Sequence, residues 1–291
     1  MQIVFHTGAH ATSEDRLLKC LLKNKDGFAK KGVAVPGPSR YRELIKDSCK
    51  ALAASDPSPD ARDVLIDAIL DEELSDRILM SDASLIGWRN YALSHGVLYP
   101  RAGERLDQLQ RLFALDQIEI FMAIRNPATF LPAVFQKKPE NAIQAALSLV
   151  DLGALRWSET LMRMRAAAPE IPITVWCYED SPLIWAQIIR EMAALDHGEK
   201  IVGGFDLLGA IMSKEGMQRF RTYLHQNKGF TEIQKRRVIS AFLDKYALEE
   251  ELEQELDLPG WTEDLVEMMS DVYDEDVYEI QRIPGVQFIS P

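Results

Sequence analysis

Three observations in the sequence predict a doubly wound α/β fold with a parallel sheet. Apolar runs of strand length alternate with stretches of helical periodicity. Most of these runs are continuously apolar, as expected of parallel strands buried on both faces. After about residue 181 the pattern is only that of helices and loops. We therefore expect an α/β core over residues 1–200 and a helical C-terminal extension over residues 201–291, packed on the same domain.

The individual elements follow from this alternation. Strands are predicted at 2–6, 32–37, 76–82, 117–127 and 171–180. Helices are predicted around 13–28, 40–53, 60–72, 157–164, 182–195, 213–226, 231–246, 248–257 and 261–270. The closing stretch "IPGVQFISP" is expected to be extended or irregular. A chain of 291 residues with 47% hydrophobic residues fills the core of such a domain easily.

The negative charge is concentrated near the C-terminus. Residues 248–279 hold 14 Asp and Glu and no Lys or Arg, so the remainder of the chain carries +2 of the net −12. An acidic segment of this kind disfavours nucleic acid and anionic membranes as partners. We expect it to be a solvated helical face rather than a docking arm for a basic partner.

Several absences in the sequence indicate a cytoplasmic protein. The longest apolar runs are short and broken by charges, which predicts no membrane span. The chain enters a strand at "MQIVF" with neither a basic segment nor a cleavage site, so no secretory signal is expected. Cys20, Cys49 and Cys177 are odd in number and widely spaced, which suits a reducing compartment. No pair of ligands joins His6 and His10, so we expect no metal.

Polar residues follow several of the predicted strands. In open parallel sheets, ligands bind beyond the carboxyl ends of the strands. The residues found there are His6–Thr12, Ser81–Asp82, Arg125–Pro127 and Tyr178–Asp180. The stretch "HTGAHATSEDRLL" has the order of a phosphate-binding loop, in which a strand leads through a glycine turn into a helix. We expect a ligand site at this edge of the sheet.

Several segments, taken in chain order, resemble the sulfotransferase family, whose donor is 3′-phosphoadenylyl sulfate (PAPS). A bacterial branch of the family opens with H-x-G-x-H-K-T-G-T-T-x-L, and His6, Gly8, His10, Thr12 and Leu17 match it. "KKGVAVPG" and "LMSDASL" resemble its next two strands, while "FMAIRNPATFLPAVF" and "VWCYEDSPLIW" resemble later segments. The resemblance covers roughly residues 1–195.

The resemblance implies a P-loop-type sulfotransferase fold and sulfuryl transfer from PAPS to a hydroxyl or amine of a carbohydrate or small molecule. The implied nucleotide-binding residues are Gly8, His10, Thr12, Ser13 and Arg125, with Arg125 on the 3′-phosphate. The catalytic candidates are His10, Ser81 and Asp82. Ser81 and Asp82 either polarise an acceptor hydroxyl or cap the next helix, and we prefer the cap. The acceptor and the oligomeric state stay open.

The chain departs from the family pattern at functional positions. The family's lysine falls on Ala11, its carboxylate on Ala83 and the serine partner of its arginine on Ala133. Its glycine and two threonines fall on Ser13, Glu14 and Asp15. These changes predict weakened or lost donor binding. A non-catalytic binding or interaction protein on the same scaffold is therefore the alternative, and a transferase of another P-loop type is a third possibility.

The order "TSED" predicts how the helix after the loop begins. Thr12 is expected as N-cap and Asp15 as the third helical residue, in a capping box that puts carboxylates where a phosphate would lie. Two like charges about 5 Å apart repel by ~3 kcal/mol at an effective dielectric constant near 20. Arg16 and Lys19 follow on the next turn, and either restores positive charge or pairs with Glu14 and Asp15.

Simple structural roles are expected for the remaining candidates. We interpret His95 as a turn residue, and Glu179 and Asp180 as caps of a helix that starts near Pro182. An acid near Arg125 is an alternative partner for its guanidinium.

Overall fold

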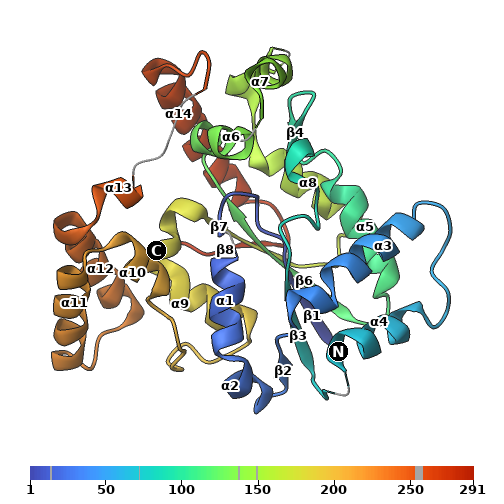
Figure 1. Ribbon diagram of the computed structural model, residues 1–291, viewed down its shortest axis with the longest axis horizontal. Helices are drawn as coiled ribbons and strands as arrows, with labels where there is room; N and C mark the ends of the chain where they lie inside the picture. The colour runs from blue at the N-terminus through green and yellow to red at the C-terminus, as the bar shows by residue number, and fades with distance from the viewer. Residues whose placement is uncertain (14, 72, 137, 149, 253–257) are drawn as a thin grey trace.

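The computed structural model describes residues 1–291 except 14, 72, 137, 149 and 253–257. The chain has an α/β fold in which helices flank a six-stranded sheet (Figure 1). The strands pair in parallel in the order β2-β3-β1-β6-β7-β8. Their bounds are β1 Gln2–His6, β2 Val33–Ala34, β3 Arg77–Ser81, β6 Gln117–Ile124, β7 Ile173–Cys177 and β8 Val286–Phe288. The predicted α/β fold with a parallel sheet is confirmed.

Fourteen α-helices and a short hairpin complete the described part of the chain. The hairpin pairs β4 (Leu93–Ser94) with β5 (Val97–Leu98). The helices of the first half are α1 Arg16–Lys23, α2 Lys25–Ala29, α3 Arg42–Ala51, α4 Ala61–Leu70, α5 Ala102–Leu112, α6 Pro127–Phe135 and α7 Glu140–Leu147. Those of the second half are α8 Trp157–Ala167, α9 Ser181–Met192, α10 Asp206–Ile211, α11 Lys214–Gln226, α12 Glu232–Tyr246, α13 Glu249–Leu252 and α14 Glu263–Ile280.

Both faces of the sheet are covered. In β1, Ile3 and Phe5 enter a large apolar cluster with α3, α4, α5, α6, α8 and α14, while Val4 enters a second cluster with α1, α2 and α9. All three side chains are fully buried. Burial on both faces is the reason that the strand segments read as continuous apolar runs. A third, smaller cluster joins α10, α11 and α12 beside the sheet (Figure 1).

The register of the strands brings their carboxyl ends to one edge. His6 of β1 lies between Ser81 of β3 and Phe121 of β6. Ile124 at the end of β6 is paired with Cys177 at the end of β7. Arg125 and Tyr178, which come directly after these two residues, therefore emerge side by side. This edge is the one at which ligands of open α/β sheets bind.

The last strand, β8, forms in the stretch that was expected to be extended or irregular. Its first residue, Val286, pairs with Ile173 of β7. Gly285 precedes the strand with φ +79°, and a Cβ atom there would lie 2.2 Å from Nη2 of Arg165. The left-handed backbone favours glycine, and any other residue would also displace the guanidinium of Arg165. The strand has only three residues, and they are partly exposed at the sheet edge, so no strong apolar pattern marks it.

One member of the acidic segment has a buried role. Asp276 of α14 is 2% exposed and accepts hydrogen bonds from the backbone N–H groups of Trp157 (2.6 Å) and Ser158 (3.2 Å). It thus caps the start of α8, a role that the prediction of a solvated face did not include. Part of the predicted helix 248–257 lies outside the described residues, and α13 covers Glu249–Leu252.

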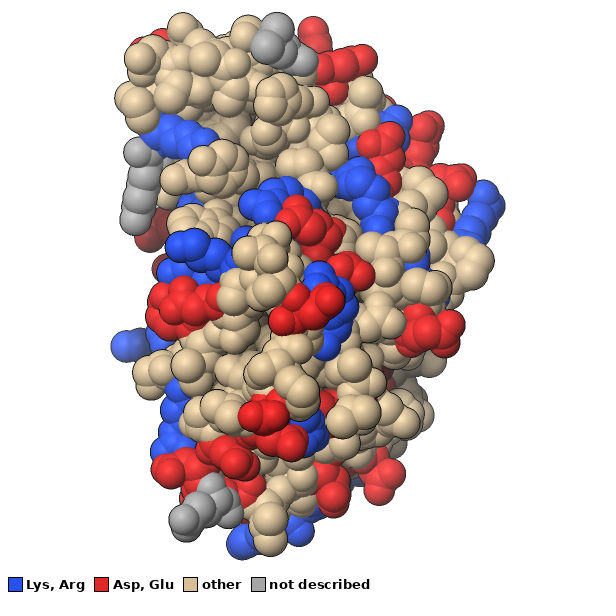
Figure 2. Space-filling model, turned by 90° about the vertical axis from the view of Figure 1, so that its right-hand side faces the viewer, with Lys and Arg blue, Asp and Glu red and all other residues tan. Residues whose placement is uncertain are grey.

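The surface carries both signs of charge close together. On the face that Figure 2 shows, basic and acidic side chains are interspersed. The described residues form ion pairs between exposed or partly exposed side chains, such as Lys46–Glu43 and Arg111–Asp56. Among the helices of the described residues, none has both the length and the apolar character that crossing a membrane requires.

Candidate functional site

The loop after β1 extends the sheet and then turns back. The backbone N–H groups of Thr7 and Ala9 donate to Phe121 and Ala123, each at 2.9 Å, so the loop first runs along β6. Gly8 has φ +52° and Ala11 has φ +57°, and these left-handed residues bend the chain. A Cβ atom on Gly8 would lie 3.4 Å from Oγ1 of Thr12, so the loop closes tightly on itself.

The predicted capping box at the start of α1 is wrong. The helix begins at Arg16, and Asp15 is its N-cap in a left-handed conformation (φ 63°) without a side-chain cap. Thr12 instead donates its hydroxyl to the carbonyl of Ala9 at 2.6 Å. The Asp15 carboxylate accepts from Nη2 of Arg42 at 2.6 Å. This partner lies on α3, so no local pattern reveals it. Glu14 lies outside the described residues.

A cavity of about 420 Å³, here called the first cavity, opens beside this loop. It is lined by Ala11, Thr12, Ser13, Arg16, Arg125, Pro132, Ala133, Gln136, Tyr178, Glu179, Pro182, Leu207, Ile211, Glu251 and Leu252. Of the five predicted nucleotide-binding residues, the structure brings three to this cavity: Thr12, Ser13 and Arg125. Gly8 is buried under the loop, and His10 faces another cavity.

Arg125 is fixed at the wall of the first cavity by four kinds of contact. Its Nη1 donates to the carbonyl of Ala11 at 2.6 Å, and its Nε donates to Oγ1 of Thr129 at 3.0 Å. The guanidinium lies 4.9 Å from the ring centre of Tyr178. Its own carbonyl accepts from the indole of buried Trp157 at 2.8 Å. The side chain is therefore preorganised, and it ties β6 to the loop.

Arg16 adds a second positive charge to the same cavity. It is the first residue of α1 and forms no ion pair within the part of the chain that the structure describes. The start of a helix also carries a partial positive charge from its N–H groups. An arginine here faces a charge of its own sign, and an anion in the cavity would relieve that repulsion.

Glu179 and Glu251 are the acids that line the first cavity. The Glu179 carboxylate accepts from the backbone N–H of Asn126 at 2.9 Å and from the hydroxyl of Tyr273 at 3.3 Å. Burial raises the pKa of Glu179 above its ordinary value. The expected role as a helix cap is wrong, because α9 begins at Ser181 without a side-chain cap.

A second cavity of about 590 Å³ lies on the other side of the loop. It is lined by His10, Arg42, Glu43, Ile45, Lys46, Cys49, Asp82, Ser84, Leu85, Trp88, Arg89, Asn90 and Arg105. Two of the predicted catalytic residues, His10 and Asp82, meet here. Residue 10 therefore lines one cavity and residues 11–13 line the other, so both cavities border the same loop.

The surroundings of His10 keep its ring uncharged. Its backbone N–H donates to the hydroxyl oxygen of Tyr99 at 2.8 Å, and its Nδ1 lies 2.6 Å from that oxygen. Two tautomers fit this contact: the hydroxyl donates to an unprotonated Nδ1, or a protonated Nδ1 donates to the hydroxyl oxygen. Burial, assisted by nearby Arg89, lowers the pKa of His10 to about 4. At neutral pH the ring is therefore a poor base.

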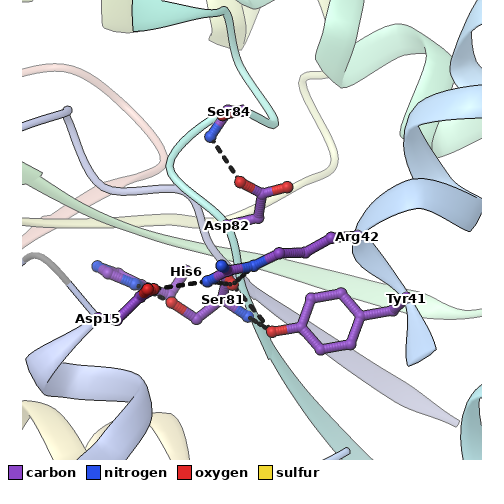
Figure 3. A network of polar contacts seen from close by, with 7 residues as sticks. All are labelled: His6, Asp15, Tyr41, Arg42, Ser81, Asp82 and Ser84. Carbon is purple, nitrogen blue, oxygen red and sulfur yellow. Dashed lines mark hydrogen bonds and ion pairs between the residues drawn. The ribbon is translucent and has the colours of Figure 1, made fainter. Parts of the chain in front are cut away.

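Ser81 belongs to a buried network behind the second cavity (Figure 3). Its hydroxyl lies 2.8 Å from Nδ1 of His6. The Tyr41 hydroxyl accepts from the backbone N–H of Ser81 and donates to the backbone carbonyl of Ser81, both at 2.9 Å. Nη2 of Arg42 donates to the same carbonyl at 2.9 Å and also holds Asp15. Ser81 is 4% exposed and lines neither cavity, so it supports the site from behind.

Asp82 stabilises a turn and not a helix. Its Oδ1 accepts from the N–H of Ser84 at 2.8 Å, and the chain continues in turns, so the preferred prediction of a helix cap is wrong. Figure 3 shows its second carboxylate oxygen directed away from Ser84. Burial raises the pKa of Asp82, which makes its carboxylate a stronger base than an exposed one.

The two other substituted alanines lie in different places. Ala133 lines the first cavity, and its carbonyl accepts from Arg89. Ala83 lies partly exposed in the turn after Asp82. His95 is in the turn between β4 and β5 with φ 51°, beside the hydroxyl of Ser94, as a turn residue should be.

Sequence reasoning missed Arg42 and Arg89, which line the second cavity, and Tyr99, whose hydroxyl bonds His10. Each comes from a segment without a recognisable motif, and each reaches the loop only through the tertiary fold. Within the described residues, no group of three or more His, Cys, Asp or Glu side chains is placed to hold a metal ion.

Comparison of the chain with protein-family models, curated proteins and solved structures found no match.

Proposed function

We propose that this protein is a divergent sulfotransferase with a variant of the P-loop sulfotransferase fold. In this proposal the first cavity binds PAPS or its desulfated product PAP, and an acceptor hydroxyl or amine enters from the second cavity. The observation that carries the proposal is the convergence of Arg16, Arg125 and the loop residues 11–13 on one cavity at the carboxyl edge of the sheet.

The charges around the first cavity support an anionic ligand. Arg125 would hold the 3′-phosphate, and Arg16 with the N–H groups of residues 11–13 would face the 5′ side. The cavity volume falls in the range of about 300–1,000 Å³ that is typical of small-molecule sites. Asp15 is directed to Arg42, so one of the two carboxylates expected to repel the donor is neutralised. Arg16 offers the positive charge that the family lysine supplies.

The proposed transfer breaks the bond between the sulfuryl sulfur and the bridging phosphate oxygen of PAPS. A new bond joins that sulfur to the acceptor oxygen, whose proton passes to Asp82, and PAP leaves with the bridging oxygen. Catalysis of this kind depends on positioning and on neutralising charge at the leaving oxygen. Because Ala11 replaces the lysine that neutralises this oxygen in the family, we expect transfer to be slow.

Calorimetric titration with PAP tests the proposal. We expect micromolar binding, and Arg16→Gln should weaken it by roughly tenfold, since a hydrogen bond to a charged group is worth about 1.5–3 kcal/mol. Lys19→Gln is the matched control, because Lys19 is exposed on the same helix and does not line the cavity. No detectable binding of PAP at millimolar concentration would rule out the donor site.

Restoring the family lysine is a gain-of-function test. Ala11 lines the first cavity, and Ala11→Lys adds a charge without a new conformational demand, because both residues carry a Cβ atom. We expect roughly tenfold tighter PAP binding and faster sulfuryl transfer. The variant Asp82→Asn should slow transfer at unchanged PAP affinity, which separates the proposed base from the nucleotide site.

The alternative function is that of a non-catalytic binding protein on the same scaffold. The alanines at positions 11, 83 and 133 favour it, since each lacks the polar group that the family uses there. This alternative predicts that the protein neither binds PAP nor gains affinity through Ala11→Lys.

A further inference from the structure

Two cavities adjoin each other on the His10 side of the loop. Next to the second cavity lies a third one of about 570 Å³, lined by Ile86, Gly87, Trp88, Tyr91, Ser94, Tyr99, Pro100, Arg101 and Arg105. Trp88 and Arg105 line both. Each volume alone suits a ligand of ordinary size, so the pair fits an elongated ligand with more than one ring.

The second cavity is lined by the carboxylates of Glu43 and Asp82 and by four basic side chains, two of which form no ion pair within the described residues. Lys46 is paired with Glu43 at 2.7 Å, and Arg42 is paired with Asp15 at 2.6 Å. Arg89 and Arg105, in contrast, form no ion pair with any residue that the structure describes. Arg105 donates its Nη1 to the amide oxygen of Gln108 at 2.9 Å.

Arg89 is held in place by backbone groups. Its Nε donates to the carbonyl of Val134 at 3.3 Å, and its Nη2 donates to that of Ala133. These bonds fix the plane of the guanidinium at the last turn of α6 and leave Nη1 as a further donor. A guanidinium that is fixed, and whose charge is not neutralised by a carboxylate, is well suited to bind a carboxylate ligand.

Aromatic side chains form the other part of these two cavities. Trp88 is 49% exposed and Tyr91 is 63% exposed, which is unusual for side chains of this size. Both line the third cavity. The ammonium of Lys46 lies 5.5 Å from the ring centre of Trp88 and so covers part of one indole face. The exposed aromatic surface offers a flat apolar contact to a ring-shaped ligand.

We propose that the second and third cavities bind an acidic saccharide chain, with a uronate carboxylate at Arg89 and Arg105 and a neighbouring sugar ring against Trp88. The role of this saccharide as the sulfuryl acceptor rests on the proposed function, whereas its binding does not. Sugar rings have an apolar face that packs on an indole, and they have hydroxyls that reach polar groups such as the imidazole of His10 and the carboxylate of Asp82.

The combination of features favours this class over simpler ligands. A free inorganic anion needs the arginines but not the exposed Trp88 and Tyr91. A neutral saccharide uses the aromatic surface but leaves Arg89 and Arg105 without a counter-charge. An aromatic acid uses both, yet it fills only one of the two adjoining cavities.

Titrations of the full chain without nucleotide test this proposal. The probes are tetragalacturonate, a glucuronate-containing tetrasaccharide, the neutral cellotetraose, 4-hydroxybenzoate and inorganic sulfate. We expect at least one acidic tetrasaccharide to bind roughly tenfold more tightly than cellotetraose, because a hydrogen bond to a charged group contributes about that factor. Its affinity should fall as salt concentration rises, since salt screens the pairing of exposed charges.

Variants locate the binding. Arg105→Gln and Trp88→Ala should each weaken the acidic tetrasaccharide by roughly tenfold. Arg111→Gln is the matched control, since Arg111 lies on the same helix as Arg105 but lines neither cavity. All three variants should keep the PAP affinity of the unaltered chain, which is measured separately at the first cavity.

Several results would overturn the proposal. One is that acidic and neutral tetrasaccharides bind equally tightly. Another is that 4-hydroxybenzoate or sulfate binds more tightly than either acidic tetrasaccharide. A third is that neither acidic tetrasaccharide binds. Saccharide binding that Trp88→Ala and Arg105→Gln leave unchanged would also contradict it. If PAP fails to bind while an acidic saccharide binds, the proposed function fails and the saccharide site stands.

Discussion

Helices α1 and α12 begin in opposite ways. Thr231 caps α12 with a complete capping box, in which its hydroxyl accepts from the N–H of Gln234 and the Gln234 side chain accepts from the N–H of Thr231. At α1 the cap is Asp15, whose carboxylate is held by Arg42 and bonds no N–H of the helix. The start of α12 is closed by the chain's own side chains. The start of α1 has no side-chain cap, and the N–H of Arg16 donates to the backbone carbonyl of Ser13, so this start is open to a ligand on the side-chain side alone.

This difference indicates what each helix start contributes. A closed start stabilises the fold, because it satisfies donors that otherwise need water. An open start beside a cavity, followed by an arginine, contributes less to stability and more to ligand binding. Substitutions at α12 should therefore change stability alone, and substitutions at α1 should change binding more than stability.

The largest expected effect is a loss of folding stability at acid pH, because His6 is buried beneath the loop that leads into α1. His6 is 2% exposed below the loop, and burial lowers its pKa to about 4, with Asp15 opposing and Arg42 assisting this shift. Between pH 6.5 and 4 the unfolded state therefore binds more protons than the folded state. The stability from neutral His6 is present above pH 6.5, and about 3 kcal/mol is lost as the pH falls to 4.

Chemical denaturation from pH 8 to pH 4 measures this loss. The free energy of unfolding of His6→Asn should depend less on pH than that of the unaltered chain. The control is His225→Asn, a change of an exposed histidine on α11, which should keep the pH dependence of the unaltered chain. Hydrogen exchange should show residues 7–18 opening at acid pH before residues 231–236. Identical pH profiles for the chain and for His6→Asn would contradict this prediction.

The next effect is the loss of the closed cap. Thr231→Ala removes the hydroxyl that accepts from Gln234, and the free energy of unfolding should fall by about 1 kcal/mol. Urea denaturation measures this change, and PAP titration provides the second readout. An altered PAP affinity would show that the two helix starts are not independent.

The smallest change in stability is expected at the open start. Asp15→Asn removes a surface ion pair, in which Asp15 is 52% exposed and Arg42 is 30% exposed. Pairs of this kind are worth about 0–1 kcal/mol, and asparagine tolerates the left-handed conformation of residue 15. Urea denaturation should change little, whereas PAP should bind more tightly because the charge of Arg42 beside the loop is then no longer neutralised by Asp15. A large loss of stability would show that Asp15 is a structural cap.

The sequence predicted the central strands and the edge of the sheet that carries the site, because burial on both faces leaves a continuous apolar record. The sequence also predicted that Thr12, Ser13 and Arg125 lie close together, because each follows the end of a strand or lies in the loop after it. It failed where the decisive partner is distant in the chain. Asp15 was predicted to be a local cap because Arg42 becomes its neighbour only through the fold. His10 lines the second cavity and not the first, because Tyr99 holds its ring there.

Strand β8 has a consequence for the protein during its synthesis. Its residues follow β7 by more than a hundred positions, yet they supply the neighbour that covers the outer hydrogen-bonding groups of Ile173 and Val175. Until segment 286–288 leaves the ribosome, β7 has an unprotected edge of apolar residues, which is a template for association with other chains. Nascent copies in crowded polysomes are therefore most prone to aggregate in the interval between the emergence of β7 and that of β8.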